Sequence, residues 1–226
     1  MIVSLSASAW SQERLPEEAA AGQWLFTPGR VELGEMAGGG FSVAEKTRPT
    51  TLFAFLPRLG YVFVQQDQFL PGSLEIVGEP TYFTVFQHRT VHVGGLAALL
   101  TYNVSTGTAW TPYLVGGAGV SFASHRFPPD GTNFNFMTEN GLGLHYAIGA
   151  QSTVNLDWRY HYFSNADIPP RNPGLNGSLC LIGVLFLYRQ AEFLPRSRTA
   201  DAESVSAVLP RFPPVPCSSV RARPFP

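Results

Sequence analysis

The feature that most constrains the fold of this chain is the strict alternation of polar and apolar side chains in its most regular segment. Between residues 153 and 162, polar side chains occupy the odd positions and apolar or aromatic side chains the even ones. A period of two places the two sets on opposite faces of a β-strand, whereas a helix would show a period near 3.6. The polar set is Asn155, Asp157, Arg159 and His161, and the apolar set is Val154, Leu156, Trp158, Tyr160 and Tyr162.

Seven further segments resemble this one, and clusters of Gly, Pro, Asp, Asn, Ser and Thr separate them. Such clusters mark turns between strands. We therefore predict eight strands, over residues 31–43, 51–65, 72–86, 92–105, 111–124, 133–148, 153–165 and 175–188. Pro57 and Pro80 fall inside two of them; since proline cannot donate to a ladder, we expect both at bulges or strand ends.

The composition favours a barrel in a membrane over a soluble sheet protein. Only 14% of the residues are charged while 45% are hydrophobic and 13% aromatic, whereas ordinary soluble domains carry about a quarter of charged residues. Apolar runs are far shorter than the roughly 20 residues of a transmembrane helix. The predicted fold is thus all-β: an eight-stranded antiparallel up-and-down transmembrane β-barrel of a Gram-negative outer membrane, with an apolar lipid face and a polar lumen.

This fold predicts which side chains face lipid and which face the lumen. Trp158, Tyr160, Phe134 and Phe186 are expected outside. The charged residues of the strands are expected inside as a paired network, because buried charges need partners; they are Glu32, Arg58, Glu75, Glu79, Glu139, Asp157 and Arg159. A soluble lipocalin-like barrel would instead have an apolar lumen and a polar exterior.

Several function classes find no support in the residues. The formal net charge is -1 and there is no Lys/Arg-rich run, which excludes the basic surface typical of a nucleic-acid-binding protein. Neither Cys180 and Cys217 nor His88 and His92 have the spacing of a metal site, so no cofactor is expected. The glycines at 38–40 and 116–117 lack the context of a phosphate cradle and are interpreted as packing glycines.

The chain divides into three predicted parts. Residues 1–29 are a signal-peptide remnant, with a small-residue cleavage site at 7–9, plus an N-terminal segment; a disordered N-terminus is the alternative. Residues 30–188 form the barrel, and 189–226, rich in Pro, Arg and Ser, form a disordered tail. The aromatic residues Phe186 and Tyr188 after Gly183 resemble the C-terminal signal read by the barrel assembly machinery, which is therefore an expected partner.

Loop lengths predict the orientation of the barrel, since outer-membrane barrels pair short periplasmic turns with longer external loops. The link at 149–152 is tight, whereas 125–132 and 166–174 are long. The C-terminal end of the strand at 153–165, with Ser164 and Asn165, is therefore expected to face the outside and the outer leaflet.

The run from Trp158 to Ala166, followed by Asn172-Pro173-Gly174-Leu175-Asn176, resembles the lipid A 3-O-deacylase family, also called acyloxyacyl hydrolases. Weaker similarities at residues 31–42 and 112–121 extend the resemblance over about residues 30–188. The resemblance implies an outer-membrane barrel that removes an ester-linked acyl chain from lipid A, or lipopolysaccharide, with a serine nucleophile, a histidine two residues before it and an acid in the next strand.

The resemblance assigns roles to four positions in this chain. Ser164 matches the nucleophile and Asn165 the position implicated in the oxyanion hole. Tyr162 stands at the histidine position and Asn176 at the acid position. A serine hydroxyl needs a base and an orienting third group, and a phenol is a poor base at neutral pH. The triad is therefore predicted to be degenerate.

His161 is the alternative base, yet its parity places it in the lumen. A bulge could rotate it outward, because one extra residue shifts the alternation. Two functions follow from these residues: a lipid A esterase acting through Ser164, or a barrel of the same descent that has lost catalysis and serves as a structural or lipid-binding protein. The sequence leaves a homodimer and the cleaved acyl position open.

Overall fold

The computed structural model describes residues 25–43, 50–87, 89–128, 130–168 and 174–189, and all eight predicted strands are present. They are β1 (Arg30–Val43), β2 (Thr51–Gln66), β3 (Gly72–Phe86), β4 (Val91–Val104), β5 (Trp110–Ala123), β6 (Phe134–Ala147), β7 (Ser152–Ser164) and β8 (Leu175–Arg189). Each boundary lies within two residues of its predicted position. Of the predicted N-terminal part (1–29), residues 1–24 lie outside the described residues, and so do residues 190–226 of the predicted tail (189–226); Arg189 is the last residue of β8.

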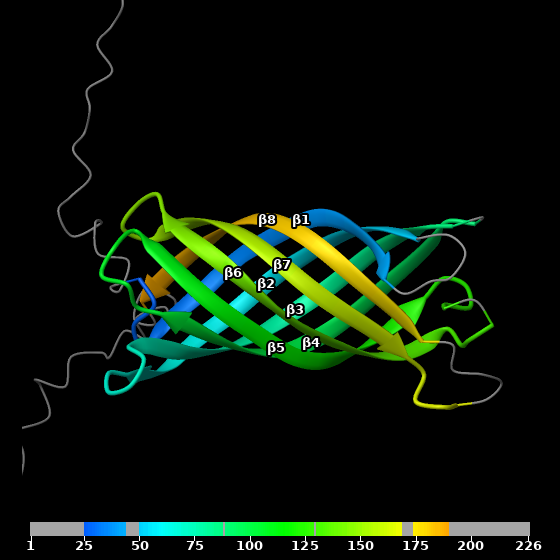
Figure 1. The fold of residues 1–226 in the computed structure, drawn as a ribbon, viewed down its shortest axis with the longest axis horizontal. Helices are drawn as coiled ribbons and strands as arrows, with labels where there is room; N and C mark the ends of the chain where they lie inside the picture. The colour runs from blue at the N-terminus through cyan, green and yellow to red at the C-terminus, as the bar shows by residue number, and fades with distance from the viewer. Residues whose placement is uncertain (1–24, 44–49, 88, 129, 169–173, 190–226) are drawn as a thin grey trace, which may run out of the picture. The chain divides into compact units, whose positions relative to one another are not determined.

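The strands form one closed antiparallel barrel in sequence order, and β8 pairs with β1 to complete it (Figure 1). Closure leaves no sheet edge unpaired. We call the end that carries Arg30 and Arg189 the base and the end that carries Val43, Ser164 and Leu175 the rim. The connections at the rim include 124–133 and 165–174, which are longer than the base turns 67–71, 105–109 and 148–151. The described residues contain no helix long and apolar enough to cross a membrane.

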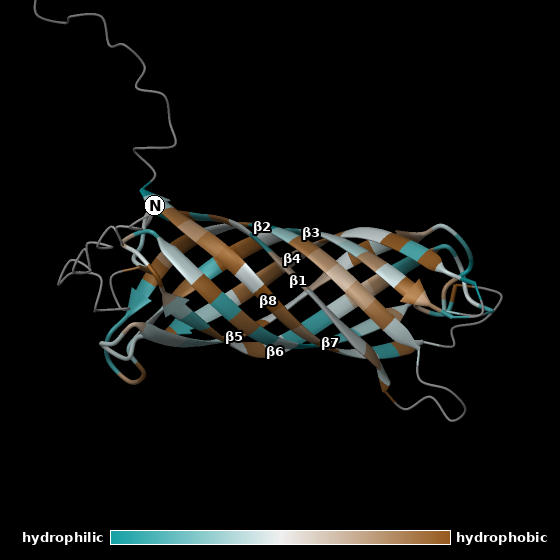
Figure 2. Cartoon of the chain, turned by 90° about the horizontal axis from the view of Figure 1, so that it is seen from above, coloured by the Kyte–Doolittle hydropathy of each residue, from teal (hydrophilic) through white to brown (hydrophobic). Residues whose placement is uncertain are grey.

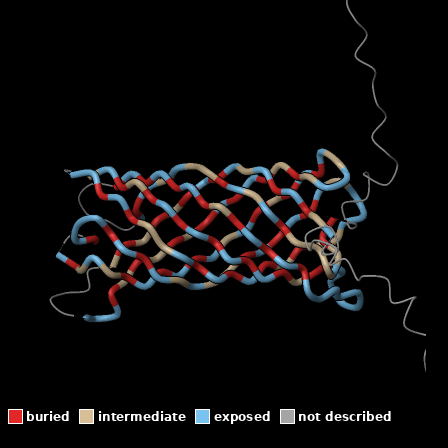
Figure 3. Tube along the Cα trace, turned by 180° about the vertical axis from the view of Figure 1, so that it is seen from behind, coloured by how far each residue is buried: buried red, intermediate tan, exposed pale blue. Residues whose placement is uncertain are grey.

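Alternation places the two faces as predicted. Asp157 and Arg159 are 2% and 0% exposed in the lumen, while Trp158 and Phe186 are exposed and Tyr160 and Phe134 half-buried on the outside. Figure 2 shows hydrophobic and hydrophilic residues alternating along the strands, and Figure 3 shows buried and exposed residues alternating in the same way. Charged residues inside and apolar residues outside exclude a lipocalin-like arrangement.

The positions of Pro57 and Pro80 differ from the prediction, because neither proline lies at a bulge or at a strand end. The register between β2 and β3 shifts only at Val62 and Val64. Pro57 and Pro80 face each other in mid-strand, within a gap between the pairs Phe55↔Tyr82 and Leu59↔Gly78. Since each proline lacks an N–H, their opposition concentrates both missing donors in one interruption of the ladder.

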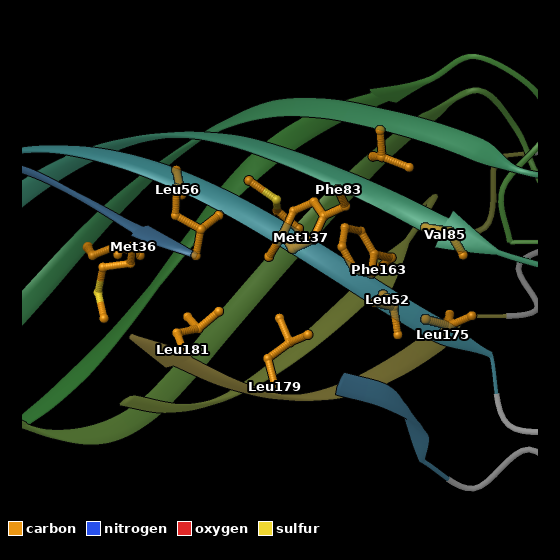
Figure 4. Close-up of a cluster of buried hydrophobic side chains, with 14 of the residues drawn as sticks. Met36, Leu52, Leu56, Phe83, Val85, Met137, Phe163, Leu175, Leu179 and Leu181 are labelled. Atoms are coloured by element: carbon orange, nitrogen blue, oxygen red, sulfur yellow. The ribbon is translucent and has the colours of Figure 1, made fainter. Parts of the chain in front are cut away.

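The lumen is not uniformly polar, in contrast to the expectation from sequence. Its rim half is filled by apolar side chains that converge from several strands, among them Leu52, Phe83, Phe163 and Leu179 (Figure 4). Phe127 of the 124–133 loop also packs there, with its ring centroid 5.4 Å from that of Phe163. Charged side chains occupy the middle of the lumen. The rim half of the barrel is therefore a packed core.

Two glycine clusters allow strands to approach closely. A Cβ at Gly38 or Gly40 would collide with backbone carbonyls of β8, and one at Gly117 with a backbone carbonyl of β4. These positions point into the lumen, where small residues relieve crowding in a narrow barrel. The interpretation of these three residues as packing glycines is therefore confirmed.

Candidate active site

Ser164 is the last residue of β7 and lies half-buried on the outward face at the rim. Its Oγ accepts a hydrogen bond from the backbone N–H of Ala166 at 3.1 Å. The hydroxyl is thereby oriented at the point where the strand ends and the loop begins. A nucleophile at this position would meet substrate at the outer edge of the barrel wall.

The chain turns sharply directly after this serine. Ala166 and Asp167 have φ values of 53° and 61°, in the left-handed region that residues with a Cβ rarely adopt. Asn165 closes the turn, because its Nδ2 donates to the Ile168 carbonyl at 2.8 Å and its own carbonyl accepts from the Ile168 N–H at 3.1 Å. Backbone strain of this kind concentrates at functional sites.

Asn165 is only 1% exposed and lies on the face opposite to Ser164. Its side-chain amide stabilises the loop from within and is directed away from the outward face. The amide therefore fixes the backbone beside Ser164, and direct donation by Asn165 to an oxyanion stays a prediction.

Tyr162 and Asn176 are direct cross-strand neighbours in the register of β7 and β8. Both are half-buried on the outward face, one step below Ser164. The positions that match the family's histidine and acid are thus adjacent, at the separation of a few ångströms typical of cross-strand pairs. Neither residue type supplies the chemistry of a base or an acid, so a catalytic role for this pair stays a prediction.

The phenol of Tyr162 lies against Gly174. A Cβ at this glycine would be 2.9 Å from the Tyr162 hydroxyl oxygen, and the glycine has a φ of 56°. The β7–β8 register ends at the pair Phe163↔Leu175, and Ser164 and Gly174 are the next residues along the two chain segments. The Tyr162 hydroxyl is therefore directed toward the level of Ser164, and glycine at 174 makes the space that the ring occupies.

Asn176 already accepts a hydrogen bond: the Tyr160 hydroxyl donates to its Oδ1 at 2.5 Å. One step deeper, the Trp158 Nε1–H donates to Ser178 Oγ at 2.9 Å. These diagonal hydrogen bonds give the polar groups partners on a surface that faces lipid, where water is absent. Neither Tyr160 nor Ser178 was predicted from the sequence as a site residue, because these hydrogen bonds depend on the β7–β8 register.

His161 lies in the lumen, as its parity predicts. It is 0% exposed, its Nε2 is 3.4 Å from Glu139 Oε2, and its ring packs edge-on against Phe83 with centroids 5.3 Å apart. The registers of β7 with β6 and β8 run without a shift, so no bulge turns the imidazole outward. The structure does not bring His161 to Ser164.

The predicted charge network is present beneath the site, except that Glu75 forms no ion pair among the described residues. Arg159 is bound by Asp157 and Glu139, both at 2.9 Å, and by Glu79 at 3.4 Å. Arg58 extends the network to Glu32 at 3.1 Å and lies 3.7 Å from the same Glu79. All these side chains are fully buried. The network links β7 to β1, β2, β3 and β6 and holds the strand that carries Ser164.

Metal chemistry has no candidate ligands here: the described part of the chain contains no group of three or more His, Cys, Asp or Glu side chains arranged to hold an ion. His92 is exposed, with Nδ1 2.9 Å from the Tyr82 hydroxyl, and Cys180 is exposed on the outer wall. His88 and Cys217 lie outside the described residues.

Comparison with known proteins agrees with this architecture. A family model described as lipid A 3-O-deacylase (PagL) matches residues 58–184, more than half of the chain. No curated protein sequence matches. Among solved structures, the outer membrane enzyme PagL is 19% identical, with 67% of this chain and 97% of that chain covered and a TM-score of 0.52. Neisserial surface protein A is 15% identical, with 71% and 97% covered and a TM-score of 0.53.

The structural likenesses concern the fold, whereas the family match covers β7 and most of β8, the strands that carry the site. The two longest rim connections, 124–133 and 165–174, favour the rim as the extracellular end and the base as the periplasmic end, and this orientation stays a prediction. The chain is therefore an outer-membrane β-barrel of the Gram-negative type and belongs to the lipid A 3-O-deacylase (PagL) family.

Proposed function

We propose that this barrel is an acyloxyacyl hydrolase-like esterase that removes an acyl chain from lipid A at the outer leaflet, with Ser164 as nucleophile. The observation that carries the proposal is the shared outward face of Ser164, Tyr162 and Asn176 at the extracellular rim. Family membership supports lipid A as the substrate, since an enzyme on this face meets lipid directly from the membrane.

In the proposed reaction, Ser164 Oγ attacks the ester carbonyl carbon and forms an acyl-serine. The ester C–O bond breaks, and the sugar oxygen leaves as a hydroxyl that carries the proton lost by the serine. Water then cleaves the acyl-serine, which releases a fatty acid and restores Ser164. Because His161, the alternative base, lies in the lumen, water is proposed to accept the serine proton, and the reaction is expected to be slow.

Tyr162 has a positioning role in this proposal. Its hydroxyl lies over Gly174 at the level of Ser164, where it can donate a hydrogen bond to the substrate's carbonyl oxygen. A donor aimed at the oxygen that becomes negative stabilises the transition state without acting as a base. Asn176 carries no charge, and its hydrogen bond with the Tyr160 hydroxyl orients both side chains on this surface.

The second candidate is a non-catalytic lipid A-binding barrel of the same descent. It is favoured by one specific observation, the hydrogen bond that engages Asn176 Oδ1 with the Tyr160 hydroxyl. This pair stabilises a neutral surface at the positions where the family places a base and an acid. Such a surface can bind lipid A without cleaving it.

The two functions are separated by mass spectrometry of lipid A from cells that express each variant. Loss of a triad member typically lowers turnover by several orders of magnitude and leaves residual oxyanion-hole catalysis. We expect slow deacylation by the wild type, none by Ser164→Ala, and faster deacylation by Tyr162→His with Asn176→Glu. Ser178→Ala is the matched control, because it removes an outward serine of β8 and leaves the proposed nucleophile in place.

Three results would contradict the esterase. Fast cleavage by the wild type that Ser164→Ala abolishes would show that another base exists. Cleavage that persists in Ser164→Ala would show that the nucleophile is wrong. If the folded, restored double variant also fails to cleave, the lipid-binding barrel is the better account; heat-modifiable gel mobility establishes that the variant is folded.

The assembly machinery of the outer membrane is a proposed partner as well. Phe186 is exposed and Tyr188 half-buried on the outward face at the end of β8, after Gly183. Their outward orientation near the periplasmic base leaves both aromatic side chains accessible to an assembly factor that receives the last strand.

A further inference from the structure

A cavity of about 320 Å³ opens at the periplasmic base, at the opposite end of the barrel from Ser164. It is bounded by the β2–β3 turn, the ends of β3, β4 and β5, and the N-terminal residues Phe26 and Thr27. Since liquid water occupies about 30 Å³ per molecule, the cavity has room for roughly ten waters. This volume lies at the lower end of the range of small-molecule sites.

The N-terminal segment helps to build this cavity. Leu25 and Phe26 are buried in one cluster with Val62, Ala147 and Leu187, and Phe26 also lines the cavity. The Phe26 ring lies 4.4 Å from the ring of His145, which stacks on Tyr113 at 4.0 Å. An aromatic anchor thus holds the segment in place, so the wall of the cavity is fixed.

The walls present polar groups that need partners. Ser73 is 2% exposed and lines the cavity, and its Oγ has no hydrogen-bond partner among the described residues. Asn103 forms part of the lining and is fully engaged, since Nδ2 donates to Glu75 Oε2 at 3.1 Å and Oδ1 is 3.2 Å from His145 Nε2. A buried hydroxyl without a partner carries a free-energy penalty that a ligand can remove.

The charge around the cavity is negative. Asp67 is the one ionisable side chain among the described residues that line it, and Arg30 and Arg189, at the β1–β8 side of the base, are not in the lining. Beneath Asn103, Glu75 is fully buried and forms no ion pair within the described part of the barrel.

From this combination we infer that the periplasmic cavity is a binding site for a small organic cation with a primary ammonium group. The ammonium pairs with Asp67 and donates to Ser73 Oγ, and the Phe26 side of the cavity packs against the aliphatic part. Among the described residues that line the cavity, Asp67 carries a negative charge and none carries a positive one, so a cation is favoured at this mouth. The site is independent of the proposed lipid A chemistry, because it lies at the other end of the lumen, beyond the packed rim.

The test is isothermal titration of the full-length, refolded barrel in detergent with putrescine, a small diamine, and with butanediol as its uncharged analogue. We expect saturable binding of putrescine that weakens with salt, and none of butanediol. Ser73→Ala should weaken binding about tenfold, as expected for a hydrogen bond to a charged group. Asp67→Asn should weaken it by up to about fivefold, since Asp67 is exposed.

Asp130→Asn is the matched control, because it removes the same charge from an exposed loop at the extracellular rim and should leave binding unchanged. Detergent without protein gives the baseline. The inference is overturned if putrescine does not saturate, if butanediol binds equally well, or if Asp67→Asn and Asp130→Asn have equal effects. Heat-modifiable mobility checks that each variant is folded before titration.

Discussion

Replacement of Arg159 by methionine should destabilise the barrel strongly. This guanidinium is fully buried and lies 2.9 Å from Asp157 Oδ2, 2.9 Å from Glu139 Oε2 and 3.4 Å from Glu79 Oε1. Its removal leaves these three carboxylates with Arg58 alone, which is 3.7 Å from Glu79. Loss of one partner of a buried pair lowers the free energy of unfolding by about 3–5 kcal/mol, because charge is left uncompensated in a low-dielectric interior.

A compensated variant tests the cause of that loss. Arg159→Met combined with Glu139→Gln and Asp157→Asn removes the charges that the first change strands, so most of the lost stability should return. Arg126→Met is the matched control, since Arg126 is exposed in a rim loop and its loss should change the free energy of unfolding by less than about 0.5 kcal/mol.

The measurement is urea unfolding of barrels refolded into lipid vesicles, followed by tryptophan fluorescence and by gel mobility of unheated samples. The reasoning is refuted if Arg159→Met lowers the free energy of unfolding by less than about 1 kcal/mol, the ceiling for an exposed pair. It is also refuted if the compensated variant is no more stable than the single one.

Three other outcomes follow from the structure. Ala166→Gly should raise the free energy of unfolding by about 1 kcal/mol, because glycine adopts a φ of 53° without steric strain; an equal or lower value in urea titration would argue against strain. Ile182 lies near mid-strand and is 61% exposed on the outer wall. Ile182→Arg should lower the free energy of unfolding in vesicles by about 2–4 kcal/mol, and an unchanged free energy of unfolding would place the membrane elsewhere. Because Phe83 and Phe163 pack in the rim half of the lumen, planar bilayers with the protein should show no channel conductance, whereas discrete current steps would reveal an open path.

Sequence reasoning predicted which residues belong to the candidate site, but it did not predict the contacts between them. Ser164, Tyr162 and Asn176 were placed on one outward face from parity and from the family resemblance, and the structure agrees with that placement. The Tyr160–Asn176 hydrogen bond and the position of Tyr162 over Gly174 were not predicted. They depend on how far β8 is shifted relative to β7, which alternation within one strand does not encode.

The strands and their two faces followed from sequence alone, because side-chain alternation is a property of the local backbone with a period of two. Pairing is not local. Arg159 meets Glu79 from a strand 80 residues earlier, Pro57 faces Pro80 within one gap of the ladder, and the N-terminal segment enters the base beside His145. Only closure of eight strands sets these neighbours, since it fixes the register of every pair at once and determines which inward side chains share the lumen. The sequence therefore determined the inside and the outside of the wall, and the tertiary structure decided which residues meet across it.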